Sequence, residues 1–120
     1  MKAIVVFHDS NAHPLARILK NGFQHCFVCV QSKEHWIRIN LLGPVPEIQV
    51  DAPSHYDLFA YYKDMGYNVV RTTQRGNRMS RVNPFFGTLM VANCVGLVKT
   101  VLNINTFSWT PYSLYKELTK

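Results

Sequence analysis

The sequence has few cysteines, few acidic residues and no long hydrophobic run, and each of these shortages excludes a class of protein. The longest apolar stretches, such as Ala3–Phe7 and Leu89–Ala92, are far shorter than the roughly 20 residues that a membrane-spanning helix needs. An odd number of cysteines, three, argues against a framework made of disulfides alone and favours a reducing compartment. Lys2 leads directly into an apolar stretch without the separate regions of a secretory signal peptide. We therefore expect neither a signal peptide nor a membrane span.

The shortage of acidic residues leaves the chain basic. Seven aspartates and glutamates stand against 13 lysines and arginines, which gives a net charge of +6. This charge suits an acidic partner, but it does not by itself indicate nucleic-acid binding. Four arginines gather around Gly76, and the usual meaning of such a string is a solvated loop; a contact with phosphate, with an acidic substrate or with a partner subunit is the sharper alternative. These arginines are Arg71, Arg75, Arg78 and Arg81.

The composition is that of a globular protein, with 48% hydrophobic and 17% charged residues. A chain of 120 residues can bury one real core, so we expect a single domain over residues 1–120. Strand patterns cover residues 3–7, 23–31, 35–41, 47–51 and 67–73, and the alternation of polar and apolar residues at 47–51 is typical of a half-buried strand. Helix patterns cover residues 15–20, 56–65, 112–118 and a segment from Cys94 to near Asn103. The expected fold class is α+β, a mostly antiparallel sheet packed against a few helices.

Cys94 is the best candidate nucleophile in the chain. Asn93 is a favoured N-cap residue, which places Cys94 in the first turn of the expected helix. Exposed backbone N–H groups and the helix dipole favour a thiolate there, and the thiolate is the nucleophilic form of cysteine. The alternative is that Cys94 packs as a small buried hydrophobic residue, as free cysteines commonly do.

His25 is the candidate partner of this cysteine. Side chains alternate along a strand, so His25, Phe27 and Cys29 are expected on one face of the sheet. A histidine in an otherwise apolar strand needs a polar partner or a wet pocket. If His25 lies against the start of the Cys94 helix, the two can form a thiolate–imidazolium pair. The alternative is a histidine at the edge of the core that is bonded to the backbone.

Other histidines and cysteines carry weaker signals. Cys26 and Cys29 have the spacing of a metal or redox pair, but residues three apart on a strand point to opposite faces. No second pair is spaced to complete a zinc site, and we expect no metal and no other cofactor. His8 and His13 flank a turn, where they could line a cleft, although solvated loop histidines are commoner.

The order of these pieces resembles the circularly permuted branch of the papain-like cysteine hydrolases and acyltransferases. Lecithin–retinol acyltransferase-like enzymes and relatives of bacterial cell-wall peptidases belong to this branch. The matching pieces are Gly22-Phe23-Gln24-His25 entering a strand, Trp36–Asn40 on the next strand, and Asn93-Cys94-Val95 opening a helix. With Lys99 and the terminal Thr110–Tyr115, the overall look is most similar to small proteins of tailed phages and their hosts.

The resemblance implies a permuted papain-like fold in which Cys94 is the nucleophile and His25 the general base. Papain-like sites orient the histidine with a polar side chain from the next strand, and Asn40 is preferred for that role. His35 is the rival, because the acyltransferase-like members use a second histidine on that strand, although at a spacing that this sequence does not match. An oxyanion hole would use the Cys94 backbone N–H and one further donor, for which Gln24 lies on the wrong strand face.

Two functions from different classes follow as expectations. The first is a cysteine hydrolase, an amidase or peptidase with an acyl-enzyme on Cys94, whose natural substrate by resemblance is a peptidoglycan peptide; lipid or protein acyl transfer stays open. The second is a non-catalytic structural or binding component of a phage particle or another assembly. Either function places the protein in the cytoplasm of a host cell or in a virion.

Overall fold

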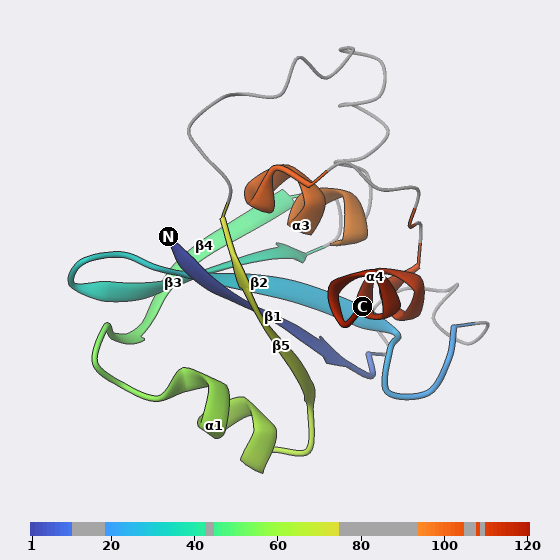
Figure 1. Cartoon of the computed structure of the whole chain (residues 1–120), viewed down its shortest axis with the longest axis horizontal. Coiled ribbons are helices and arrows are strands. Elements are labelled where there is room, and N and C mark those ends of the chain that lie inside the picture. The colour runs from blue at the N-terminus through green and yellow to red at the C-terminus, as the bar shows by residue number, and fades with distance from the viewer. Residues whose placement is uncertain (11–18, 43–44, 75–93, 105–107, 109) are drawn as a thin grey trace.

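An antiparallel sheet of five strands forms the centre of the part of the chain that the structure describes (Figure 1). The computed structural model describes residues 1–10, 19–42, 45–74, 94–104, 108 and 110–120. The strands lie in the order β4-β3-β2-β1-β5, and every neighbouring pair is antiparallel. Their bounds are β1 Lys2–His8, β2 His25–Gln31, β3 His35–Leu42, β4 Val45–Pro53 and β5 Asn68–Thr73. The predicted α+β class is confirmed.

Helices cover both faces of this sheet. Helices α3 (Cys94–Leu102) and α4 (Pro111–Leu118) pack on one face, and α1 (Leu58–Asp64) packs on the other. The alternation of β1 explains this arrangement, because Val5 and Phe7 belong to the core under α3 and α4 while Ile4 and Val6 belong to the core under α1. None of the described helices is long and apolar enough to cross a membrane.

Helix α4 is fixed to the sheet by its cap and by aromatic rings. Thr110 caps this helix and forms a capping box with Ser113, and Pro111 occupies the first turn. The ring of Tyr115 meets that of Phe7 edge to face at a centroid distance of 5.5 Å, and Tyr112 meets Phe23 at 5.0 Å. These ring contacts join the last helix to β1 and to the segment that precedes β2.

The outermost strand of the sheet, β4, differs from its prediction. The strand expected at 47–51 is longer, and most of its residues are exposed rather than half-buried. It is an edge strand, and Val45, Ile48 and Val50 keep 62 to 69% of their surface exposed because no described helix covers them. Residues 15–18 of the helix expected at 15–20 lie outside the described residues, and its last two residues, Leu19 and Lys20, are not helical. The cap residue Asn93 and most of the loop from 74 to 84 also lie outside the described residues.

Candidate active site

His25 and Asn40 meet at one end of the sheet. His25 is the first residue of β2, and Asn40 lies near the end of β3, the neighbouring antiparallel strand. The Nε2 atom of His25 lies 2.6 Å from Oδ1 of Asn40. An amide oxygen only accepts, so Nε2 carries the proton and donates it to Asn40. This bond fixes the imidazole ring and leaves Nδ1 as the nitrogen that can exchange a proton with a nucleophile.

Cys94 contacts this histidine from helix α3, which packs on the sheet. The pairing of β2 with β3 runs from Val28 to Gln31 and does not include residues 25–27 of β2. Helix α3 begins at Cys94, whose sulfur hydrogen-bonds the side chains of His25 and Cys26, the first two residues of β2. The helix therefore presents its N-terminus, with its orphan backbone N–H groups, to the end of the sheet that carries His25.

Several hydrogen bonds hold Cys94 as a thiolate. The largest effect is the hydrogen bond from the Cys26 side chain, and the hydrogen bond and positive charge of His25 act in the same direction. Together they outweigh burial, which disfavours the thiolate, and lower the pKa of Cys94 to about 4. Burial alone would lower the pKa of His25, but the hydrogen bond and charge of Cys94 raise it overall. Each group therefore favours the charged form of the other, which is the electrostatic arrangement of a thiolate–imidazolium pair.

Cys26 is the residue of this site that sequence reasoning missed. Its side chain is 1% exposed and lies in the core under α3, and burial raises its pKa well above the ordinary value. It stays a thiol and acts as a hydrogen-bond donor to the Cys94 sulfur, with its backbone N–H as a second donor. The sequence shows only that Cys26 and Cys29 point to opposite faces, which the structure confirms.

His8 is a second histidine at the same end of the sheet. It ends β1 directly opposite His25, and the two rings meet edge to face at a centroid distance of 5.2 Å. Its Nδ1 atom donates to the Asp9 carbonyl at 2.7 Å, so Nε2 is left as an acceptor. Burial lowers the pKa of His8 and keeps it neutral. The pairing register of β1 with β2, which the sequence does not reveal, brings His8 here.

No family model matches this chain, and neither curated proteins nor solved structures gave a match. The chemistry of the site therefore has to be argued from the chain itself.

The remaining candidates lie elsewhere or have other partners. His35 is exposed at the opposite end of β3, where its backbone N–H bonds Ser32. The Oε1 atom of Gln24 accepts from the Ser10 N–H. Arg71 lies over the ring of Phe59 at 3.7 Å from its centroid.

The other three arginines of the basic string and His13 lie outside the described residues. Among the described residues, no group of three His, Cys, Asp or Glu side chains is placed to hold a metal ion.

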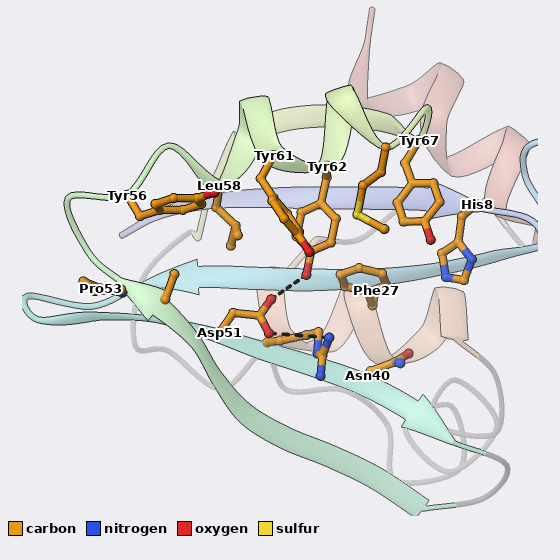
Figure 2. Close-up of a pocket in the computed structure, with 13 residues that line it drawn as sticks. His8, Phe27, Asn40, Asp51, Pro53, Tyr56, Leu58, Tyr61, Tyr62 and Tyr67 are labelled. Carbon is orange, nitrogen blue, oxygen red and sulfur yellow. Dashed lines mark hydrogen bonds and ion pairs between the residues drawn. The ribbon is translucent and has the colours of Figure 1, made fainter.

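An aromatic trench runs away from the site under α1. It is a hollow of about 570 Å³, and Asn40 and His8 lie at one end of it, with Pro53 and Tyr56 at the other (Figure 2). Rings form much of its lining, contributed by β2, α1 and the segments that flank α1. They are Phe27, Tyr56, Tyr61, Tyr62 and Tyr67.

Charged groups in the trench are paired with one another. Asp51 lies 3.5 Å from the Arg38 guanidinium and accepts a hydrogen bond of 2.5 Å from the Tyr62 hydroxyl. Cys29 donates to the same carboxylate at 3.8 Å, and burial with the nearby charge of Asp51 raises the pKa of Cys29. Cys29 is therefore a neutral thiol in the core, and Cys94 stays the candidate nucleophile.

For a site in which Cys94 acts as the nucleophile, loss of the Asn40 side chain is expected to weaken catalysis without abolishing it. A lost hydrogen bond worth about 1–3 kcal/mol corresponds to a fall of roughly 5- to 150-fold in kcat/KM. Because the bond to Asn40 raises the pKa of His25, Asn40→Ala also lowers that pKa, and the alkaline limb of the pH–rate profile moves to lower pH. The measurement is ester hydrolysis across pH. Asn40→Asp, which keeps an acceptor, serves as the matched variant; equal losses in both would contradict a positioning role.

Proposed function

We propose that this protein is a cysteine hydrolase, an amidase or peptidase that works through an acyl-enzyme on Cys94. The observation that carries the proposal is the hydrogen-bonded series Cys94, His25 and Asn40, in which the cysteine begins a helix and the histidine is oriented by an amide oxygen. A thiolate beside an imidazolium, with the ring held by a third group, is the arrangement that nucleophilic catalysis by cysteine requires. No cofactor takes part in this reaction.

The reaction proceeds in two balanced halves. The Cys94 thiolate forms a C–S bond with the substrate carbonyl carbon, and the electron pair of the carbonyl moves to its oxygen. The Cys94 backbone N–H, one of the orphan donors of the α3 terminus, serves as the proposed hydrogen-bond donor to that oxygen. When the intermediate collapses, the amine leaves with the proton of His25. Water then attacks the thioester and gives its proton to the neutral imidazole, and the thiolate is released.

The order of the site residues supports membership of the permuted papain-like branch. His25 comes early on a strand, Asn40 follows on the next strand, and Cys94 comes late at a helix start. By this resemblance, peptidoglycan peptides are the first substrates to test, and acyl transfer to an acceptor other than water is the main variant of the reaction. The host-cell cytoplasm or a phage particle is the proposed place of action.

Trapping the acyl-enzyme tests the proposal directly. The wild-type protein is mixed with a p-nitrophenyl ester, quenched with acid and digested, and the peptides are read by mass spectrometry. We expect one acyl group on the peptide that contains Cys94, and none on Cys26 or Cys29, whose thiols stay protonated. Acylation confined to lysines or tyrosines would contradict the proposal, because it would show ordinary surface chemistry.

A second candidate function is a non-catalytic component of an assembly, such as a small phage structural protein. The observation that favours it is the outer strand β4, which exposes Val45, Ile48 and Val50 at the edge of the sheet. Exposed apolar edge strands are surfaces to which other chains add. Co-purification with a larger assembly together with an unreactive Cys94 would favour this candidate over the hydrolase.

A further inference from the structure

We propose that the aromatic trench binds an uncharged aromatic group on the acyl side of the substrate. This inference rests on the proposed function for its orientation, since it places the scissile carbonyl at Cys94 and the aromatic group beyond Asn40 and His8. The trench itself is independent of the chemistry. Its volume of about 570 Å³ lies within the range of about 300–1,000 Å³ of small-molecule sites.

The first argument is the continuity of the trench with the catalytic histidine. Asn40, which holds His25, also lines the trench, and so does His8, which contacts the His25 ring. Figure 2 shows both residues at the same end of the hollow. Cys94 and His25 do not line the trench themselves, so an acyl group on the Cys94 sulfur would enter it past Asn40 and His8.

The second argument is the arrangement of the rings. Tyr62 meets Phe27 edge to face at 5.3 Å and lies parallel to Tyr67 at 6.1 Å, while Tyr67 also stacks on His8 at 5.0 Å. The lining thus offers both faces and edges of rings. Aromatic groups gain from such geometry beyond the area they bury, whereas saturated groups of the same size do not.

The third argument is exposure at the rim. Tyr56, Tyr61 and Met65 are large apolar residues that remain 45 to 49% exposed, and all three line the trench. Exposed apolar residues that gather around one hollow mark a binding site more often than scattered ones do. These rim residues gain burial when a ligand occupies the hollow.

The fourth argument concerns charge and decides the class of ligand. The Arg38 guanidinium is paired with Asp51 inside the trench and lies 3.7 Å from Glu47 beside it. Burial and the hydrogen bond to Asp51 raise the pKa of Tyr62, which stays protonated, and His8 is neutral. The charges of Arg38 and Asp51 thus offset each other in the trench, so a charged ligand group would be desolvated without a net opposite charge to pair with in the described part of the lining. The buried Nε atom of Arg38 has no hydrogen-bond partner among the described residues and is a donor available to an uncharged ligand.

Binding to the Cys94→Ala protein tests the inference without turnover. The probes are 3-phenylpropanamide, 3-cyclohexylpropanamide, the anion succinamate and the cation 3-aminopropanamide, titrated by calorimetry or two-dimensional NMR. We expect the phenyl amide to bind roughly 2- to 10-fold more tightly than the cyclohexyl amide. Both charged amides are expected to bind at least about 10-fold more weakly than the phenyl amide. Equal affinity for phenyl and cyclohexyl, or tighter binding of a charged amide, would overturn the aromatic assignment.

Two matched substitutions locate the binding. Tyr61→Ala removes a rim ring that is 45% exposed, so the fold is retained, and we expect the phenyl amide to bind about 5-fold more weakly or worse. Ile48→Ala, at an apolar position that is 69% exposed on β4 and outside the trench, is expected to leave binding unchanged. If Tyr61→Ala bound the phenyl amide as tightly as the protein with Tyr61 does, or if no binding were detected at all, the inference would be overturned.

The outcome for the trench and the outcome for the hydrolase are separable. If Cys94→Ala binds the phenyl amide while the wild-type protein forms no acyl-enzyme, the proposed function fails and the aromatic site stands. If the wild-type protein is acylated equally fast by acetyl and 3-phenylpropanoyl esters and Tyr61→Ala changes neither rate, the hydrolase stands and the aromatic site fails.

Discussion

Cys94→Ala is expected to lower kcat/KM for ester and amide hydrolysis by at least about 10⁴-fold, the scale on which removing a catalytic nucleophile acts. No other described cysteine can replace it. The Cys26 thiol is held protonated by burial, and Cys29 lies on the other face of the sheet beside Asp51. The measurement is steady-state hydrolysis of a p-nitrophenyl ester and of a peptide anilide by both proteins. A folded Cys94→Ala protein is expected because the side chain is only partly buried.

Cys29→Ala is the control for this experiment. It removes a sulfur from β2, the strand that carries His25, and leaves Cys94, His25 and Asn40 unchanged. Because core truncations act mainly on stability, we expect hydrolysis within about 3-fold of the wild-type rate. Circular dichroism and thermal unfolding check that both variants are folded. The hydrolase assignment would be wrong if Cys94→Ala kept the wild-type rate on every substrate that the wild-type protein cleaves.

The pair formed by His25 and Asn40 was predictable because it depends on local geometry. Strand alternation fixed the face on which His25 lies, and the short turn between β2 and β3 makes the two strands antiparallel neighbours. A residue near the start of β2 must then lie beside a residue near the end of β3. This is why Asn40, and not His35 at the start of β3, contacts the histidine.

The rest of the site was not predictable because it depends on contacts between distant segments. His8 is opposite His25 only through the pairing of β1 with β2, whose register no short motif encodes. Cys26 donates to Cys94 because α3, which is distant in the sequence, packs with its first residue against the start of β2. The aromatic trench requires α1 to pack across the sheet face that also carries Arg38 and Asp51. Sequence periodicity shows that α1 has an apolar face but not which surface it covers.

Edge effects explain why the predicted burial of β4 was wrong. Alternation of polar and apolar residues at 47–51 is typical of a half-buried strand. Val50 and Ile48 follow that pattern, yet both remain mostly exposed because the described helices cover the inner strands of the sheet and not this edge. The position of a strand within the sheet is a property of the whole topology. Alternation reports only which residues share a face.

The charge states of Cys94 and His25 predict an unusual pH profile. Alkylation by iodoacetamide requires only the thiolate, so its rate is expected to be half-maximal near pH 4, where Cys94 titrates. Hydrolysis also requires the imidazolium to protonate the leaving amine. It is expected to rise with the same acid limb and to fall again as pH passes the pKa of His25, which lies above its ordinary value of 6.5. Between the two limbs, both groups are charged.

His25→Ala is expected to remove the imidazolium that stabilises the thiolate and to move the alkylation profile to higher pH. The midpoint of the profile is then expected to lie above pH 4, so alkylation measured at pH 4 falls relative to the wild-type protein. Cys26→Ala raises the same pKa because it removes the largest stabilising hydrogen bond, but it keeps the imidazole and with it the alkaline limb of hydrolysis. Site-resolved labelling by mass spectrometry from pH 3 to 10, roughly the range that brackets both groups, separates the two variants. An unchanged profile in His25→Ala would show that the histidine does not act on Cys94, and the thiolate–imidazolium pair would have to be abandoned.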